Sequence, residues 1–415
     1  MKKICVLGLG YIGLPIASLF ATYGLKVTGV DIDKENIESI RKGKALASEP
    51  DLNIMTAAAL KSGNLITSNK PTEADVFIIA VPTPKCNDNS CDLASVIHAS
   101  ESIVTYLNRD NLVILESTVP PGTTEEVVKP ILEKSGLHAG KDFYLAHCPE
   151  KVLPGKILFE LVQNERVFGG IDKKSFEETK KLYSTFVKGK IYGTNLKTAE
   201  FIKLIENSYR DVNIAFANEL AKICRKLDMD IWESIWFANR HPRVNIHNPG
   251  PGVGGHCIAI DPWFIVNKAH ELSKLITLAR KINDSMPSYV VSIVSEAIKG
   301  IENPTISVLG AAYKAEIEDP RNSPAREIIN LLKKMNFNVK VYDPYVKNFE
   351  YAFEPNIDAA LKDSSCIIIV TDHNIFKEMS PERAARLVKD KILIDTRNCT
   401  DRENWKKSGF RWISI

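Results

Sequence analysis

The sequence carries almost no excess charge of either sign. Its 54 lysines and arginines nearly balance 51 aspartates and glutamates, which leaves a formal net charge of +3 with histidine neutral. Such a balance gives no support to a surface that coats nucleic acid or adheres to a membrane, although an anionic ligand could still meet local basic groups. We therefore expect no nucleic-acid partner and no membrane partner.

Paired cysteines are also missing. The eight cysteines are scattered, and most stand in apolar or glycine-rich surroundings, which is typical of free thiols in a reducing compartment. Cys86 and Cys91 form the one suggestive pair. A structural zinc site normally needs a second pair, so we expect no metal.

No apolar run is both long and unbroken. Residues 4–25 carry no charge and follow Lys2 and Lys3, a pattern shared with signal peptides and membrane spans. Four glycines and Pro15 interrupt this run, and another apolar segment follows at 27–30. A buried strand, a turn and a packed helix explain the pattern better. We expect a cytoplasmic protein.

The chain has 415 residues, which is too long for one ordinary core and predicts two or three domains. With 44% hydrophobic and 25% charged residues, its composition is that of a soluble globular protein. Strand-like apolar runs alternate with amphipathic stretches, and this pattern returns after Pro304. The runs are 4–7, 27–30, 76–81 and 112–115 in the first copy, and 306–309, 339–342, 366–370 and 392–394 in the second. The fold class we predict is α/β, with two Rossmann-like doubly wound domains and parallel sheets.

A long helix is expected between the two copies. From Thr198 to about Lys226 there is no glycine or proline, and apolar residues recur at helical spacing. At about 1.5 Å per residue this helix would exceed about 40 Å, which is long enough to join two domains. Segments 231–239 and 272–282 also show helical spacing.

The first copy contains a turn of the form Gly-x-Gly-x-x-Gly. Gly8, Gly10 and Gly13 follow a strand and open a helix, and Asp31 stands 23 residues after Gly8. In this context the turn brings a dinucleotide pyrophosphate to a helix N-terminus, while the acid accepts hydrogen bonds from ribose hydroxyls. A carboxylate there repels a 2′-phosphate, so we predict NAD rather than NADP. Glycines that serve only packing are the alternative.

The second copy has Gly310-Ala311-Ala312 at the matching turn. Because a bulkier turn lets a pyrophosphate approach less closely, this copy is expected to bind something else. Lys314, Arg321 and Arg397 place cations near its strand ends. A diphosphate could use these cations, although exposed cations without such a task are equally common.

A second glycine-rich segment, 252–262, carries Cys257. A cysteine on such a loop has room for a substrate carbon beside its sulfur, and Asp261 could polarise a water or hold a neighbouring lysine. A buried structural cysteine explains the segment alone equally well. His256 looks like an activating base, but adjacent side chains often point apart.

Four polar residues recur on one face of the expected long helix: Glu200, Lys203, Asn207 and Asp211. Apolar residues flank this stripe on both sides, at 201–202 and 204–205, so we expect the helix to be mostly buried rather than solvated. A lysine on a buried stripe needs a partner or a catalytic task. Two further loops add candidates. Ser117-Thr118-Val119 follows a strand end, where doubly wound sheets bind ligands, and 148–155 is a loop punctuated by proline and glycine that carries one acid, Glu150.

Together these motifs resemble the nucleotide-sugar 6-dehydrogenases, the family of UDP-glucose dehydrogenase. The resemblance covers essentially the whole chain, and six motifs appear in family order. They are the turn at 8–13, Ser117-Thr118-Val119, Pro149-Glu150, the Lys203/Asn207 helix, Gly254-Gly255-His256-Cys257 with Asp261, and Lys314 with Arg321. Segments 148–155 and 254–258 look like the branch that acts on UDP-N-acetylhexosamines, especially UDP-N-acetyl-D-mannosamine. Lys151 and Ala259 depart from that branch, which often has arginine and proline there.

The resemblance implies three domains: an NAD-binding domain at 1–196, a central helical dimerisation domain with the cysteine loop at 197–298, and a UDP-binding domain at 299–415. It also implies oxidation of the C6 hydroxyl to a carboxylate with two NAD, through a thiohemiacetal and a thioester on Cys257. The implied partners are a UDP-sugar and further copies of the chain, in a homodimer or a homotetramer.

The motifs and the resemblance together assign the site residues. The catalytic ones are Cys257, Lys203, Asn207, Asp261, Glu150 and Thr118. The cofactor would contact Gly10, Tyr11, Ile12, Gly13, Asp31, Pro82, Thr83, Thr118 and Arg321. The substrate would contact Glu150, Val152, Lys203, Asn207, Arg210, Arg243, His247, Gly254, Lys314 and Arg397. The resemblance places Arg243 in the active site of the partner subunit, whereas the simpler interpretation is a surface arginine that ends a helix.

Other functions stay open. One is a dehydrogenase of the same family that acts on UDP-N-acetylglucosamine or UDP-glucose. Another is a two-electron dehydrogenase of the hydroxyacid type, which has no need for the cysteine loop or a second nucleotide domain. A third is a catalytically silent NAD sensor or scaffold. The number of NADH formed per sugar (two, one or none) separates these classes.

Overall fold

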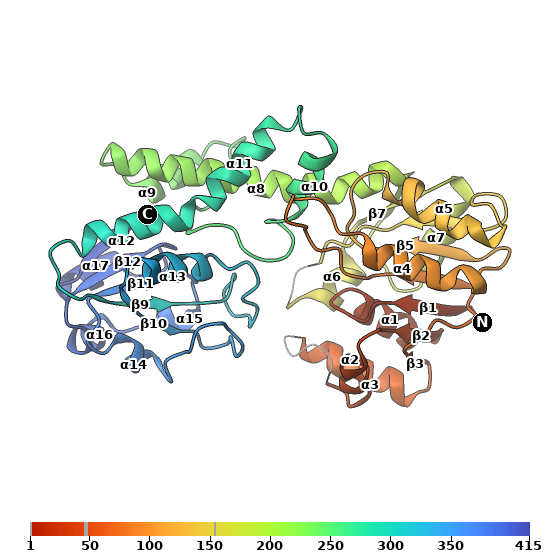
Figure 1. Ribbon diagram of the computed structural model, residues 1–415, viewed down its shortest axis with the longest axis horizontal. Helices are drawn as coiled ribbons and strands as arrows, with labels where there is room; N and C mark the ends of the chain where they lie inside the picture. Colours follow the sequence, from red (N-terminus) through yellow and green to blue (C-terminus); the bar gives the residue numbers. More distant parts are fainter. Residues whose placement is uncertain (1, 45–48, 153–154) are drawn as a thin grey trace. The chain divides into compact units, whose positions relative to one another are not determined.

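The computed structural model describes residues 2–44, 49–152 and 155–415 (Figure 1). Leu153 and Pro154, in the candidate loop at 148–155, lie outside the described residues. The chain divides into two compact units. The first comprises Met1–Glu206 and Trp263–His270, and the second Asn207–Pro262 and Glu271–Ile415.

The first unit is built on an eight-stranded sheet of order β3-β2-β1-β4-β5-β6-β7-β8. Its strands are β1 (Lys3–Leu7), β2 (Lys26–Val30), β3 (Leu65–Ser68), β4 (Val76–Ile79), β5 (Leu112–Leu115), β6 (Tyr144–His147), β7 (Arg166–Gly170) and β8 (Ile191–Asn195). The four predicted strands are all present, and six of the seven pairings are parallel. Only β6 and β7 run antiparallel, which departs from the prediction. The order reverses between β1 and β4, where doubly wound sheets open a ligand crevice.

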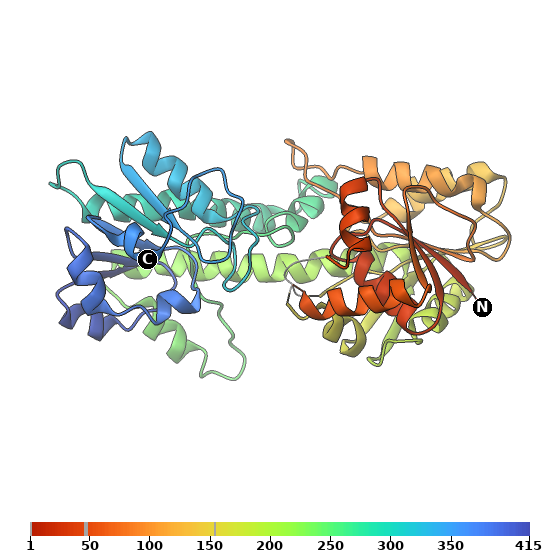
Figure 2. The same cartoon turned by 90° about the horizontal axis from the view of Figure 1, so that it is seen from below.

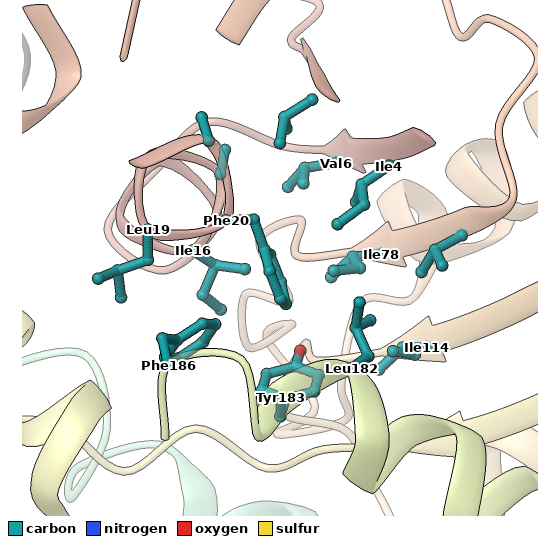
Figure 3. Close-up of a cluster of buried hydrophobic side chains, with 14 of the residues drawn as sticks. Ile4, Val6, Ile16, Leu19, Phe20, Ile78, Ile114, Leu182, Tyr183 and Phe186 are labelled. Atoms are coloured by element: carbon teal, nitrogen blue, oxygen red, sulfur yellow. The ribbon is translucent and has the colours of Figure 1, made fainter. Parts of the chain in front are cut away.

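Helices cover both faces of this sheet. They are α1 (Gly13–Thr22), α2 (Lys34–Arg41), α3 (Pro50–Lys61), α4 (Ala94–Ile103), α5 (Lys129–Leu132), α6 (Ile157–Gln163) and α7 (Lys173–Tyr183), with the short turns η1 (Val104–Tyr106), η2 (Thr124–Val128) and η3 (Glu133–Ser135). Alternate residues of β1 enter two cores, because successive side chains of a strand point to opposite faces. Val6 packs with Phe20 of α1 (Figure 3), whereas Leu7 packs with Val96 of α4. The interpretation of residues 4–25 as strand, turn and helix is confirmed.

The predicted long helix is α8 (Leu196–Lys226), which runs unbroken for 31 residues (Figure 2). Its polar stripe is buried, since the four predicted residues are between 0% and 8% exposed. The expectation that the flanking apolar residues are buried as well is wrong for Phe201 and Ile205, which are 38% and 46% exposed. The polar groups occupy the inner face because they have partners there, and apolar side chains are left outside. No helix among residues 2–44, 49–152 and 155–415 is long and apolar enough to cross a membrane.

The second unit holds a five-stranded parallel sheet of order β10-β9-β11-β12-β13. Its strands are β9 (Thr305–Leu309), β10 (Asn338–Tyr342), β11 (Cys366–Ile369), β12 (Ile392–Asp395) and β13 (Arg411–Ser414). Its helices are α9 (Ile231–Ala238), α11 (Lys274–Asp284), α12 (Met286–Ala297), α13 (Pro324–Lys334), α14 (Ile357–Leu361), α15 (Asn374–Lys377), α16 (Pro381–Leu387) and α17 (Arg402–Lys407). The helix α10 (Asp261–Lys268) belongs to the first unit from Trp263 onward. α12 and α13 pack on one face of the sheet, and α14, α16 and α17 supply the core of the other (Figure 1). The predicted second copy of the strand pattern is confirmed.

Candidate functional site

The glycine turn after β1 has the geometry that a dinucleotide needs. Gly8 has φ +91°, and a Cβ there would stand 2.4 Å from the carbonyl oxygen of Ala80. A Cβ on Gly13 would stand 1.9 Å from the carbonyl oxygen of Gly8. Gly10 differs, because a Cβ there would meet nothing within 4 Å. Gly8 and Gly13 therefore permit close packing, while Gly10 leaves space for a ligand to approach the backbone, so the residues fit the pyrophosphate of NAD.

Asp31 is oriented by three donors. Its Oδ2 accepts hydrogen bonds from the Leu9 amide (3.0 Å) and the Asn36 side chain (2.9 Å), and its Oδ1 accepts one from the Asp33 amide (2.9 Å). A carboxylate offers about four acceptor positions, so capacity remains for a ribose hydroxyl.

The matching acid of the second unit is saturated. Asp343 accepts hydrogen bonds from the amides of Ala311, Ala312, Tyr345 and Val346, and it pairs with His373 Nε2 at 3.1 Å. Burial alone would raise the pKa of Asp343, but the bonds from His373 and the amides lower it to about 2. No acceptor position is left for a ribose, which explains physically why the second copy would bind a different group.

The ends of β4 and β5 are tied together beside the crevice. Ser117 Oγ accepts a hydrogen bond from the Val81 amide (2.9 Å) and donates one to the Val81 carbonyl (2.7 Å). Thr83 Oγ1 donates to the carbonyl of Thr118 (2.7 Å). These bonds fix Thr83 and Thr118 at the carboxyl ends of the strands. Tyr11, Ile12 and Thr118 are half-buried there, and Pro82 is exposed.

The cysteine loop belongs to the second unit and packs tightly against other residues of that unit. Gly255 has φ +85°, and a Cβ on Gly254 would stand 2.6 Å from Cβ of Tyr313. The Gly255 amide donates to the carbonyl of Arg321 (3.0 Å), so this loop is anchored to the loop that follows β9. Cys257 is exposed and not in a disulfide, which contradicts the interpretation of a buried structural cysteine. Its carbonyl accepts from the Asp261 amide (2.9 Å), which sets the thiol at the turn that opens α10.

Asn207 connects two further candidates. Its side-chain nitrogen donates to Asp261 Oδ2, and its side-chain oxygen accepts from Arg210. Asn207 is 0% and Asp261 4% exposed. The amide nitrogen keeps a second hydrogen, which is available for an oxyanion. Lys203 is 8% exposed and lies one turn before Asn207 on α8.

The other two members of the polar stripe are structural. Glu200 accepts hydrogen bonds from the amides of Gly122 (2.5 Å) and Thr124 (2.7 Å), which holds the loop before η2. Asp211 pairs with Arg280 at 2.5 Å inside the second unit. Helical spacing alone could not separate these two residues from Lys203 and Asn207.

Glu150 is held by a residue that sequence reasoning missed. Glu150 follows β6 by three residues, and Arg166 is the first residue of β7, the antiparallel neighbour of β6. Arg166 Nη2 donates to Glu150 Oε2 at 2.7 Å and lies 3.5 Å from Glu116 Oε1. Burial raises the pKa of Glu116 to about 8, opposed by Arg166 and assisted by Glu150.

The remaining candidates differ in their exposure and in their contacts. Lys314 and Arg243 are exposed, His247 is half-buried, and Val152 packs against the first core. Arg321 forms a two-pronged pair with Asp319, at 2.9 and 2.7 Å. Arg397 lines a cavity of about 460 Å³ with Trp232, Trp236, Arg240 and other residues of the second unit. Among the described residues no three His, Cys, Asp or Glu side chains gather as metal ligands, and Cys91 pairs across a hairpin with Lys85.

Three family models match nearly the whole chain. They are the NAD binding domain (residues 2–187), the central domain (197–285) and the UDP binding domain (307–402) of the UDP-glucose/GDP-mannose dehydrogenase family. The chain belongs to this family. It is an NAD-dependent nucleotide-sugar dehydrogenase whose C-terminal segment is a UDP binding domain.

Individual relatives match over their full length. The chain is 48% identical over 420 residues to a UDP-N-acetyl-D-mannosamine dehydrogenase of Methanococcus vannielii, covering 99% of this chain and 96% of the relative. It is 49% identical to the enzyme of that name from Methanocaldococcus jannaschii, with 99% and 95% coverage. A solved UDP-D-ManNAc dehydrogenase from Pyrococcus horikoshii superposes with a TM-score of 0.94 at 41% identity, covering 100% of this chain and 99% of that one.

Proposed function

We propose that the chain oxidises UDP-N-acetyl-D-mannosamine to UDP-N-acetyl-D-mannosaminuronate. The observation that carries this substrate is the 48% to 49% identity, over almost the entire chain, to enzymes that bear its name. The exposed cysteine on an anchored, glycine-rich loop adds the nucleophile that a four-electron oxidation requires.

The turn at 8–13 and Asp31, together with Pro82, Thr83, Thr118 and Arg321, would hold NAD, which would supply the hydride acceptor for both oxidation steps. In the first step the C6 hydroxyl loses its proton to a water held by Lys203 and Asp261. The Cys257 thiol then adds to the aldehyde carbon and forms a thiohemiacetal, whose oxyanion Lys203 and Asn207 stabilise. As a fixed cation, Lys203 lowers the energy of the alkoxide, and it does not itself transfer a proton.

The second oxidation converts the thiohemiacetal into a thioester on Cys257. A water, activated near Glu150, Thr118 and Asp261, attacks the thioester carbon, so the carboxylate leaves and the thiol is restored. The buried ion pair with Arg166, at 2.7 Å, holds the Glu150 carboxylate in place for this step.

We propose a homodimer that forms through α8. Three apolar residues spaced seven apart on this helix are exposed: Tyr209 (58%), Phe216 (48%) and Ile223 (44%). Seven-residue spacing keeps such a stripe on one side of a helix, as helix-to-helix packing needs. In this proposal the segments 1–196, 197–298 and 299–415 bind NAD, dimerise and bind UDP, and Arg243 reaches the partner's active site. A homotetramer would need a further surface.

A panel of substrates tests the proposed specificity. Purified protein is assayed with NAD and UDP-N-acetyl-D-mannosamine, UDP-N-acetylglucosamine or UDP-glucose, and kcat/KM is compared. We expect UDP-N-acetyl-D-mannosamine to exceed both others by at least about tenfold, the discrimination that one misplaced polar contact produces. A higher kcat/KM for UDP-N-acetylglucosamine or UDP-glucose would contradict the proposed substrate but not the family.

A further inference from the structure

A buried cluster of two carboxylates and one guanidinium lies in the first unit. Glu116 directly follows β5, Arg166 opens β7, and Glu150 lies in the loop after β6, where it pairs with Arg166. Their side chains are 0%, 5% and 6% exposed. A cavity of about 10 Å³, lined by Glu150 and Arg166 among others, adjoins the pair and is about the size of one water.

One nitrogen of Arg166 serves both acids. Nη2 lies 2.7 Å from Glu150 Oε2 and 3.5 Å from Glu116 Oε1, so the guanidinium favours Glu150. Glu116 Oε2 and Arg166 Nη1 make no hydrogen bond within the described part of the chain. The guanidinium also lies over the rings of Phe168 and Tyr183, at 5.5 and 5.3 Å from their centroids. The Arg166 guanidinium can therefore choose only between two neighbouring acceptors, the carboxyl groups of Glu150 and Glu116.

The charge balance depends on Glu116. With both acids ionised, the cluster holds a net negative charge away from water, which is costly. With Glu116 protonated, Arg166 and Glu150 form a neutral pair. The titratable and charged groups that face Glu116 are Arg166, Glu150, Tyr183 at the end of α7, and Cys148 after β6. Burial, helped by Glu150, outweighs Arg166 and raises the pKa of Glu116 to about 8, so the acid keeps its proton at neutral pH.

We propose that Glu116 is a positioning residue for Glu150: while protonated it leaves Arg166 to hold the Glu150 carboxylate, and once ionised it draws Arg166 away. The inference rests on the proposed function, in which Glu150 helps water to hydrolyse the thioester. The proton of Glu116 passes to solvent and takes no part in the chemistry. The consequence is a hydrolysis step that slows above pH 8 while the two oxidations do not share that dependence.

The test follows hydrolysis separately from oxidation. Wild type, Glu116→Gln and the exposed control Glu101→Gln are mixed with labelled UDP-N-acetyl-D-mannosamine and NAD in single turnovers between pH 6 and 9.5. Stopped-flow absorbance follows NADH, which acid would destroy, and rapid acid quenching measures the sugar bound to Cys257 and the free uronate. A group with a pKa of about 8 is about one-tenth protonated at pH 9, so hydrolysis in wild type and in the control should fall roughly tenfold between pH 7 and 9. In Glu116→Gln, which cannot ionise, the hydrolysis rate should stay level.

The outcomes separate the two proposals. Hydrolysis with the same alkaline decline in Glu116→Gln and wild type, or with no decline in either, overturns the positioning role. Should no sugar become bound to Cys257 in any variant, the covalent mechanism fails instead.

If Glu116→Gln folds poorly, Arg166→Lys gives a second measurement. Lysine keeps the positive charge but lacks the paired nitrogen donors of the guanidinium. We therefore expect slow hydrolysis at every pH, with little change in the first oxidation. Equal loss in both steps would contradict the proposal.

Discussion

Cys257 combines an exposed side chain with a fixed backbone. The amide of the nearby Gly255 is anchored to Arg321, and the carbonyl of Cys257 accepts the amide of Asp261. A thiol held in this way can form a bond to a substrate carbon without reorganising the loop, which is what a nucleophile in a pre-formed site requires.

We expect Cys257→Ala to abolish four-electron turnover, with a loss of at least about a thousandfold, because the atom that retains the aldehyde is gone. A weak first oxidation should survive, since Lys203 and the NAD site are intact. Steady-state NADH formation measures the loss, and Cys224→Ala serves as the matched control because that thiol is buried in an apolar cluster with Ala217 and Ala221 and is not a proposed site residue. Two NADH per sugar at a normal rate from Cys257→Ala would disprove the covalent mechanism.

We propose that Asp31 determines the choice between NAD and NADP. Asp31→Ser removes both a ribose acceptor and the charge that repels a 2′-phosphate, so NAD should bind roughly ten- to a hundredfold more weakly and the gap to NADP should narrow. Kd values for both cofactors check this. Asp33→Ser is the control, since Asp33 caps α2 and serine can also cap a helix. A wild-type preference for NADP would reject the assignment.

The buried acid Glu116 also predicts a pH dependence of stability. Its pKa is raised from 4.5 to about 8 on folding, chiefly by burial, so its protonated form stabilises the fold. That stability is complete below about pH 4.5 and is lost as the pH rises through about 8. The Tm of wild type should therefore fall relative to Glu116→Gln by roughly 4 °C or more between pH 5 and pH 9. A constant Tm difference across this range would show that Glu116 does not titrate as stated.

At the scale of elements, α8 presents an unusual division of faces. Its polar stripe faces inward because Glu200 accepts a hydrogen bond from a backbone amide and Asp211 pairs with Arg280. The apolar residues Tyr209, Phe216 and Ile223 are exposed. Exposed apolar residues at this regular spacing are typical of a helix that packs against another helix.

Phe216→Glu is expected to break the proposed dimer, because a charge on a helix-to-helix interface would be buried without a partner. Analytical ultracentrifugation should show a shift from dimer to monomer, with the far-UV circular dichroism unchanged. Lys226→Glu, a charge change at the end of the same helix, is the control. A variant that keeps the wild-type mass would place the interface elsewhere.

The sequence predicts elements and glycine turns better than it predicts contacts. The runs at 4–7, 112–115 and 306–309 are strands because both of their faces are buried and local composition suffices to find them. The role of Arg166 could not be found in this way, since its contacts with Glu116 and Glu150 join residues that are 50 and 16 positions away in the sequence. For the same reason spacing on α8 identified a buried stripe but could not tell which of its members carry structure and which are free for chemistry.

At the scale of the whole molecule, Arg243 tests whether an active site is shared. The residue is exposed and follows α9, and a fork of donors suits sugar hydroxyls or phosphate. Subunits with Arg243→Ala are mixed with subunits with Cys257→Ala and allowed to exchange. If Arg243 acts in the partner's site, each mixed dimer has one intact site and recovers about half of the wild-type activity per dimer. No recovery, or full activity of Arg243→Ala alone, rules out a shared site.

The proposed reaction is a four-electron oxidation of UDP-N-acetyl-D-mannosamine by a single enzyme. The most direct measurement is the number of NADH formed per sugar when a limiting amount of this substrate is exhausted in the presence of excess NAD, with the product identified by mass spectrometry. The proposed mechanism predicts two NADH and the uronate. One NADH with an aldehyde or ketone product would contradict it and indicate a two-electron dehydrogenase, and no NADH would contradict catalysis itself.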